Sequence, residues 1–424
     1  MITIVKADGT AEQQQIAAMR ERAAKTGAGI EQSAREIMEA VRQRGYEAVK
    51  EYSLKFDGAE PYEIPKSELQ AAAERIAPKL LGALRRSAEN IRAYQTELLC
   101  KSRQWESPMK GGTVGQVVRG LSRVGIYVPG GRAAYPSSVL MNAVPAKVAG
   151  CGEVIMVTPP TENLNDAVLA AAWVAQVDRV IAVGGVQAVA ALTFGAGFIP
   201  RVDKLVGPGN AFVAAAKRMA YGTLDIDMVA GPSEVLVIAD ETANPVYTAA
   251  DLLSQAEHDV MASAVLLTTS QTLADQVAQE MERQTGYLSR SDVILQSLRD
   301  YGAIIVCDSL GKCCDLANEI APEHLEIMTE DPRALLPKIL NAGAVFLGQN
   351  TPEPLGDYMA GPCHVLPTSG TARFFSPLSV ESFLKKMSII DFSRDALAEV
   401  KDEIIAMAES EHLTAHANSI KVRF

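Results

Sequence analysis

The sequence predicts an α/β fold with two doubly wound lobes, a helical N-terminal segment and an extended helical C-terminal tail. Three observations lead to this prediction. Apolar residues before Pro108 recur at helical spacing, short β-branched runs alternate with helical stretches from Val124 onward, and a helical pattern returns after Pro377. Strands that alternate with helices are typical of a parallel sheet that is covered on both faces.

The N-terminal segment is expected to be mainly helical. Within residues 33–56, Ile37 and Val41 belong to a set of apolar residues at three- and four-residue spacing, and Asp57-Gly58 ends the stretch. Residues 108–120 contain two short glycine-bounded runs, TVG and QVV, which predict a small hairpin.

The first lobe is expected to begin near residue 125. Helical stretches at 138–149, 166–175, 187–194 and 211–221 separate five apolar runs, which predict strands: GIYVPGG, EVIMVTPP, RVIAVGG, KLVGPGN and VLVIAD. Most of these runs lack an alternation of apolar and polar residues, as expected of strands that are buried on both faces.

A second set of strands and helices follows. Helical stretches at 273–283, 310–320 and 333–340 separate four further runs: AVLLTT, AIIVC, LEIM and AVFLG. We therefore expect two α/β lobes. A cleft between two lobes is a common place for a ligand.

Composition and charge argue against several classes of partner. The net charge is -11 and basic residues are not clustered, so nucleic acid is a poor partner. No uncharged stretch of about 20 apolar residues is present, so no membrane span is expected. The N-terminus lacks the apolar core of a signal peptide. The six cysteines form no C-x-x-C pair, and we expect them to be reduced thiols rather than a disulfide framework. A cytoplasmic location is therefore expected.

Candidate metal ligands stand near the few histidines. Gln255 and His258 lie three residues apart, which places them on one face of a helix. Asp357 precedes His364 by seven residues in EPLGDYMAGPCH, whose glycines and prolines predict a loop. Imidazole nitrogen with carboxylate and amide oxygen suits zinc, manganese or iron. On spacing alone, the alternative is that these are ordinary surface polar groups.

The C-terminal tail offers further candidates. His416 follows Glu411 by five residues, and His412 lies one helical turn before His416. That spacing would let a helix turn both imidazoles toward one metal ion.

Glu323 and His324 form a second constellation. They follow Pro322, which fixes a turn, and lead into the strand LEIM. A histidine near its ordinary pKa suits proton transfer at neutral pH, and a neighbouring glutamate suits the activation of water. The alternative is a solvated Glu–His pair without a chemical role.

Glycine-rich loops end three strands of the first lobe. Tyr127 stands before Gly130-Gly131, Gln187 follows Gly184-Gly185, and Asn210 ends Gly207-Pro208-Gly209. Each loop precedes a helix, where backbone N–H groups bind nucleotide phosphates. Tight turns alone would explain one or two such loops, and no G-x-G-x-x-G is present, but three at one sheet favour a cofactor surface. Ser233, in the loop GPSE, could bond a substrate.

These motifs together resemble the histidinol dehydrogenase family, in the same order and over nearly the whole chain. The segments that carry the resemblance are VGIYVPGG, VGGVQAVAALTFG, VDKLVGPGNAFV, AGPSEVLVIAD, DLLSQAEHD, APEHLEI, LGDYMAG and HLTAH. Val229 departs from the pattern, since a proline is usual before AGPSE.

The resemblance implies a role for each matching residue. Glu323 and His324 match the two catalytic bases. The implied zinc ligands are Gln255, His258, Asp357 and His416. The implied substrate contacts are Ser233, Gln255, His258, His324, Asp357, His364, Glu411 and His416. The implied NAD contacts are Tyr127, Gln187 and Asn210.

The resemblance also implies one Zn²⁺ per subunit, NAD, a homodimer and oxidation of L-histidinol through L-histidinal to L-histidine. The expected organisation is an N-terminal arm at 1–17, a catalytic lobe of 18–124 with 240–376, an incomplete Rossmann-like NAD lobe at 125–239, and a tail at 377–424. In the family this tail completes the active site of the neighbouring subunit.

Three rival functions remain at this point. A paralogue of the same scaffold would oxidise another polar alcohol, but Glu411 disfavours an anionic substrate. A zinc hydrolase would use Glu323 to activate water, but the nucleotide-type loops disfavour it. A non-catalytic two-lobed binding protein would not need the paired bases.

Overall fold

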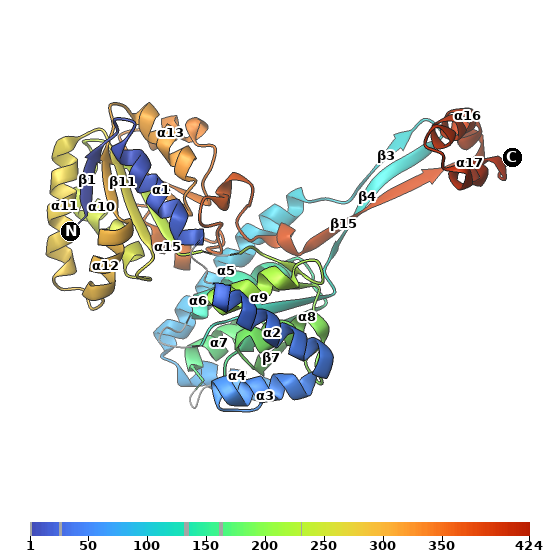
Figure 1. Cartoon of the computed structure of the whole chain (residues 1–424), viewed down its shortest axis with the longest axis horizontal. Coiled ribbons are helices and arrows are strands. Elements are labelled where there is room, and N and C mark those ends of the chain that lie inside the picture. The colour runs from blue at the N-terminus through green and yellow to red at the C-terminus, as the bar shows by residue number, and fades with distance from the viewer. Residues whose placement is uncertain (1, 25–27, 131–134, 161–163, 230) are drawn as a thin grey trace.

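The chain forms two α/β lobes and an arm that projects away from them (Figure 1). The computed structural model describes residues 2–24, 28–130, 135–160, 164–229 and 231–424. Each lobe is built around a six-stranded sheet, and the arm is a three-stranded sheet that ends in the last two helices. The predicted fold class is therefore confirmed.

The first lobe is built on a sheet in the order β2-β7-β6-β5-β8-β9. All neighbouring strands are parallel except β2, which pairs antiparallel with β7. The strands are β2 (Tyr62–Ile64), β5 (Arg123–Tyr127), β6 (Glu153–Thr158), β7 (Arg179–Ala182), β8 (Lys204–Val206) and β9 (Asp225–Ile226).

Helices cover both faces of this sheet. One face carries α4 (Lys66–Arg75), α5 (Pro78–Lys101), α6 (Pro136–Val148) and α7 (Asp166–Val174). The other face carries α2 (Ala28–Arg44), α3 (Tyr46–Asp57), α8 (Gly185–Phe194) and α9 (Ala211–Ala220). Within β6, Val154 and Met156 face one core while Ile155 and Val157 face the other, which explains the unbroken apolar runs.

The N-terminal helices pack differently from the sequence prediction. Residues 18–124 were expected to join residues 240–376, but α2 to α5 bury their apolar faces on the first sheet. Ile37 and Val41 of α2, for example, lie in one core with α8 and α9. Helical spacing shows which face of a helix is apolar, but it does not show which sheet that face covers.

The second lobe is an all-parallel sheet in the order β1-β12-β11-β10-β13-β14. Its strands are β1 (Thr3–Lys6), β10 (Glu234–Ala239), β11 (Ser263–Thr268), β12 (Ala303–Val306), β13 (His324–Met328) and β14 (Ala344–Leu347). The run VLVIAD was assigned to the first lobe, but it forms β10 here. The expected N-terminal arm contributes the edge strand β1.

Helices also cover this second sheet on both faces. One core includes side chains of α10 (Pro245–Ala256), α11 (Gln271–Thr285) and α12 (Ser291–Tyr301). The other includes side chains of α1 (Ala11–Ala24), α13 (Leu310–Ile320) and α14 (Pro332–Leu335), which continues into a short 3-10 turn at Leu336–Lys338. After β14 comes the short helix α15 (Glu353–Tyr358).

The arm is antiparallel and carries the C-terminus far from both lobes (Figure 1). It is formed by β3 (Trp105–Met109), β4 (Gly112–Gly120) and β15 (Leu384–Phe392), and it ends in α16 (Arg394–Ser410) and α17 (Thr414–Lys421). Short 3-10 turns at Thr371–Arg373 and Val380–Phe383 precede β15.

Two sequence predictions about the arm were wrong. TVG and QVV are parts of the single strand β4, and residues 384–392 form a strand where helix was expected. Most residues of β15 are exposed, so the run LKKMSIIDF has no buried face to impose an alternating pattern. In the described residues, no helix is long and apolar enough to cross a membrane.

Candidate active site

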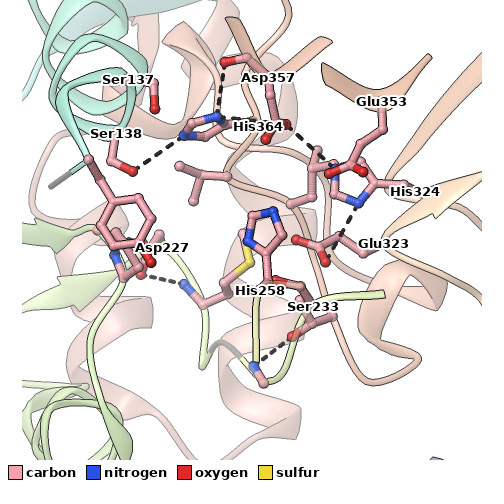
Figure 2. A pocket seen from close by; sticks show the side chains of 18 of the residues that line it. Ser137, Ser138, Asp227, Ser233, His258, Glu323, His324, Glu353, Asp357 and His364 are labelled. Carbon is pink, nitrogen blue, oxygen red and sulfur yellow. Dashed lines mark hydrogen bonds and ion pairs between the residues drawn. The ribbon is translucent and has the colours of Figure 1, made fainter. Parts of the chain in front are cut away.

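A pocket of about 380 Å³ lies where the two lobes meet. Its wall combines Ser137 and Ser138 of α6 and the loop at Gly207–Gly209 with residues from the second lobe (Figure 2). The second-lobe side chains that line it include Ser233, Gln255, His258, Glu323, His324, Glu353, Asp357 and His364. Seven of the predicted site residues therefore gather around one cavity.

Glu323 and His324 lie at the start of β13, where the strand meets the pocket. The Glu323 carboxylate accepts a hydrogen bond from the backbone N–H of Glu234, at 2.8 Å. Burial raises the pKa of the Glu323 carboxyl well above its ordinary value, and this hydrogen bond opposes the rise. Glu323 is therefore a stronger base than an exposed glutamate.

The hydrogen bonds of His324 show which of its nitrogens is basic. Nδ1 lies 3.0 Å from the backbone oxygen of Glu234. A carbonyl oxygen only accepts hydrogen bonds, so Nδ1 donates and carries the proton. Nε2 is buried and has no hydrogen-bond partner among the described residues. Burial lowers the pKa of His324 to about 4, so the imidazole is neutral at pH 7 with its lone pair on Nε2.

Gln255 lies in the last turn of α10, and His258 lies in the turn that follows the helix rather than on the same helix face that the sequence had predicted (Figure 2 shows His258). Gln255 is buried, whereas His258 is exposed on the pocket wall. Hydrogen-bonding chemistry assigns the NH₂ group of Gln255 to the side that faces Glu353, 3.0 Å and 3.3 Å from the two carboxylate oxygens, because an amide oxygen there would face only acceptors. This orientation leaves its carbonyl oxygen free for another partner.

Asp357 and His364 are held against each other. His364 Nδ1 donates to the backbone oxygen of Asp357 at 3.1 Å, and it lies 3.8 Å from Asp357 Oδ1. The other imidazole nitrogen, Nε2, lies 3.5 Å from Ser138 Oγ, across the lobe boundary. Asp357 Oδ1 is also 3.8 Å from His324 Nε2 (Figure 2).

The pocket wall also holds a group of potential metal ligands. One ligand atom from each of His324, Glu353 and Asp357 lies within 4.8 Å of the other two. Burial raises the pKa of Glu353 to about 8, and the negative charge of Asp357 adds to the rise. A bound cation would relieve this repulsion between carboxylates, so the site fits a divalent metal ion.

Two residues predicted to bind zinc or substrate lie outside this pocket in the single chain. Glu411 follows α16 and His416 lies in α17, and both side chains are exposed at the end of the arm. His412 also lies there, with a positive φ of 60°. The chain does not bring these residues to its own pocket.

The three predicted NAD contacts lie around the carboxyl ends of the first sheet. Tyr127 Oη accepts a hydrogen bond from Gly185 N at 3.0 Å. Gln187 donates to Asp57 at 3.1 Å, and both Tyr127 and Gln187 are buried. Asn210 is exposed and caps the N-terminus of α9. None of the three lines the pocket, and Gly131 lies outside the described residues.

Comparisons with known proteins agree with the fold. The family model for histidinol dehydrogenase matches residues 20–424. The chain belongs to the histidinol dehydrogenase family. The resemblance predicted from the sequence is thus confirmed, and the family name places the chain among the oxidoreductases.

Individual relatives cover almost the whole chain. A histidinol dehydrogenase of Clostridium acetobutylicum is 52% identical over 410 residues, which are 96% of this chain and 95% of that protein. One of Caldanaerobacter subterraneus subsp. tengcongensis is 53% identical over 394 residues, 92% of this chain and 91% of that protein. The crystal structure of histidinol dehydrogenase from Elizabethkingia anophelis has a TM-score of 0.93 at 35% identity, and covers 100% of this chain and 98% of that one.

Sequence reasoning missed Glu353 and Ser138. Glu353 precedes Asp357 by four residues, which is one helical turn, but the segment was predicted to be a loop and forms α15 instead. A helical interpretation of EPLGDY would have placed both carboxylates on one face. No sequence motif marked Ser138 as a site residue, because its place beside His364 depends on how α6 packs against the second lobe.

Proposed function

We propose that this chain oxidises L-histidinol through L-histidinal to L-histidine with two NAD, as the last steps of histidine biosynthesis. Family membership supports the reaction. The observation that assigns its chemistry to particular residues of this chain is the pair Glu323–His324. A neutral imidazole with a free Nε2 and a carboxylate of raised pKa face one pocket between the lobes. Two bases with different tasks suit two successive oxidations.

His324 serves the alcohol step. Its Nε2 accepts the hydroxyl proton as the carbinol C–H bond breaks and the hydride leaves. Bound NAD supplies the hydride acceptor in both steps. The hydrogen bond from Nδ1 to Glu234 O keeps the imidazole in the tautomer that this task requires.

Glu323 serves the aldehyde step. Its carboxylate removes a proton from a water molecule as the water oxygen attacks the aldehyde carbon. The proton that His324 took in the alcohol step passes to the aldehyde oxygen as the C=O π bond breaks, which gives the neutral hydrate and frees Nε2 again. His324 then accepts one hydroxyl proton of the hydrate while the second hydride leaves, and the carboxylic acid that forms loses its proton to solvent at neutral pH. The raised pKa of Glu323 makes its carboxylate basic enough to activate water near neutral pH.

We propose that Gln255, His258 and Asp357 hold one Zn²⁺, and that His416 of a second subunit completes the set. The first three line one pocket, and their oxygen and nitrogen donors are of the type that zinc accepts. Zinc, when bound, would act as a Lewis acid that binds the imidazole and amino nitrogens of the substrate. His364 and Ser233 lie where they would contact the same substrate, and Glu411 would enter with the partner's tail.

For NAD we propose contacts with Tyr127, Gln187 and Asn210. Asn210 caps α9, and the adjacent Gly207–Gly209 loop lines the pocket, so the proposed cofactor surface borders the cavity that holds the bases. Backbone N–H groups at a helix start favour the binding of phosphate groups.

We further propose that the protein is a homodimer, because the exposed arm carries His416 and Glu411 away from the chain's own pocket. We also propose a cytoplasmic location.

The deciding experiment follows NADH absorbance when the purified protein is mixed with L-histidinol and NAD. Two NADH per histidine are expected. NADH formation with another polar alcohol but not with histidinol would favour the paralogous dehydrogenase instead. Absence of NAD binding in a titration would reject both dehydrogenases and favour a zinc hydrolase.

A further inference from the structure

Glu353 connects α10 and α15, the helices that carry two of the proposed zinc ligands, Gln255 and Asp357. It lies at the first position of α15, one turn before Asp357, and its side chain faces the end of α10. Its backbone N–H donates to Glu326 at 2.8 Å, which fixes the start of α15 against β13. Glu353 is 2% exposed, so its polar contacts are made within the protein.

Both oxygens of the Glu353 carboxylate are engaged by α10. Ser254 Oγ donates to Oε2 at 3.0 Å. The NH₂ group of Gln255 lies 3.0 Å from Oε1 and 3.3 Å from Oε2. With the Glu353 carboxylate ionised, as it would be beside a bound cation, the reverse orientation of the carboxamide would place its oxygen against two acceptors.

The amide geometry then decides where the oxygen of Gln255 lies. A carboxamide has its oxygen and nitrogen on opposite sides, so fixing the NH₂ group at Glu353 turns the oxygen away from that carboxylate. Gln255 is 1% exposed and lines the pocket. Its free oxygen is the atom that a metal ion would bind.

We infer that Glu353 is a positioning residue that orients the Gln255 oxygen as a zinc ligand. This inference rests on the proposed zinc site. The competing assignment is that Glu353 is itself a ligand, since it lies close to His324 and Asp357. The bonds from Ser254 and Gln255 to its carboxylate favour the positioning role.

The test is a double-mutant cycle on zinc affinity, measured by competition with a chromophoric chelator. Glu353→Leu should weaken zinc binding roughly 10–100-fold, the usual effect of losing such an outer partner. In a Gln255→Ala background the same change should have little further effect, because the group that it orients is gone. An equal loss in both backgrounds would make Glu353 a ligand and overturn the inference.

Two variants separate positioning from folding. Glu353→Gln retains a carbonyl acceptor for the Gln255 NH₂ group, so zinc affinity and the visible spectrum of the Co²⁺-loaded protein should stay near those of the parent. Ser254→Ala removes the other bond to the same carboxylate and should leave both readouts unchanged. If Glu353→Leu does not fold, Glu353→Ala replaces it in the cycle.

The outcomes distinguish this inference from the proposed function. A parent protein that fails to bind zinc would reject the zinc site itself. A parent that binds zinc while Glu353→Leu binds it equally well would reject only the positioning role.

Discussion

Lys217 and Asp227 form a buried ion pair behind the loop that borders the pocket. Lys217 Nζ lies 2.5 Å from Asp227 Oδ1, and the two side chains are 3% and 2% exposed. Lys217 Nζ also donates to Gly207 O, and Gly207 N donates to Asp227 Oδ2, both at 2.8 Å. The pair therefore holds both polar groups of Gly207, whose φ of +110° begins the turn into α9.

Replacing Lys217 with Met should destabilise the protein. The change leaves the Asp227 carboxylate buried without its cation, which costs about 3–5 kcal/mol of unfolding free energy. Urea denaturation followed by tryptophan fluorescence measures the loss. Arg218→Met is the matched control, because Arg218 pairs with Glu31 at the exposed surface and should contribute about 1 kcal/mol or less. Equal losses in the two variants would contradict this prediction.

Replacing Glu323 with Gln should separate the two oxidations. Glutamine cannot take a proton from water, so oxidation of L-histidinal should slow by about 10²–10⁴-fold, the usual contribution of a general base. Conversion of histidinol to histidinal should change little, because His324 is intact. Single-turnover NADH formation with each substrate checks this. If both half-reactions slow equally, the division of labour between the two bases is wrong.

Acid should destabilise the metal-free protein partly through His324. Burial lowers its pKa from 6.5 to about 4. Between these pH values the unfolded chain binds a proton that the folded chain does not, so this contribution to stability is full above pH 6.5 and is lost as the pH falls toward 4. The shift corresponds to about 3 kcal/mol. In His324→Asn the pH dependence of the unfolding free energy should be shallower over that window, and an unchanged slope would refute the assignment.

Mixed subunits should test the origin of His416. His258→Asn and His416→Asn homodimers should each be inactive. If the tail completes the neighbour's site, a mixed dimer has one intact site, and random mixing should restore about a quarter of the parent activity. Co-expression with two affinity tags provides the mixed dimer. No recovery in that species would mean that each chain uses its own tail.

Most of the secondary structure of both lobes was predictable from the sequence. Runs such as EVIMVT are buried on both faces, so their composition alone marks them as strands of a covered parallel sheet. The strand β15 was not predictable in this way, because Ile390 and its neighbours are largely exposed and solvent imposes no pattern on them. The lobe to which α2 to α5 belong depends on tertiary packing, which local spacing does not encode.

The candidate site divides in a similar way. Gln255, His258, Glu323, His324 and Asp357 were identified from the sequence, and the structure gathers them around one pocket. Glu353 was missed because a proline and a glycine in EPLGDY obscured the single helical turn that relates it to Asp357. The charge states of Glu323 and His324 could not be predicted, because they follow from burial in the assembled pocket.

The edge strand β1 has a consequence for the order in which the chain assembles on the ribosome. Thr3 pairs with Ala303, so the first strand to be synthesised waits for its neighbour until most of the chain has been made. All strands of the first sheet, in contrast, have been synthesised once Ile226 has emerged. Domains generally fold as units during synthesis, so the first lobe can fold before the second lobe is complete. The strand β1 stays unpaired, and accessible to chaperones, until β12 has been synthesised.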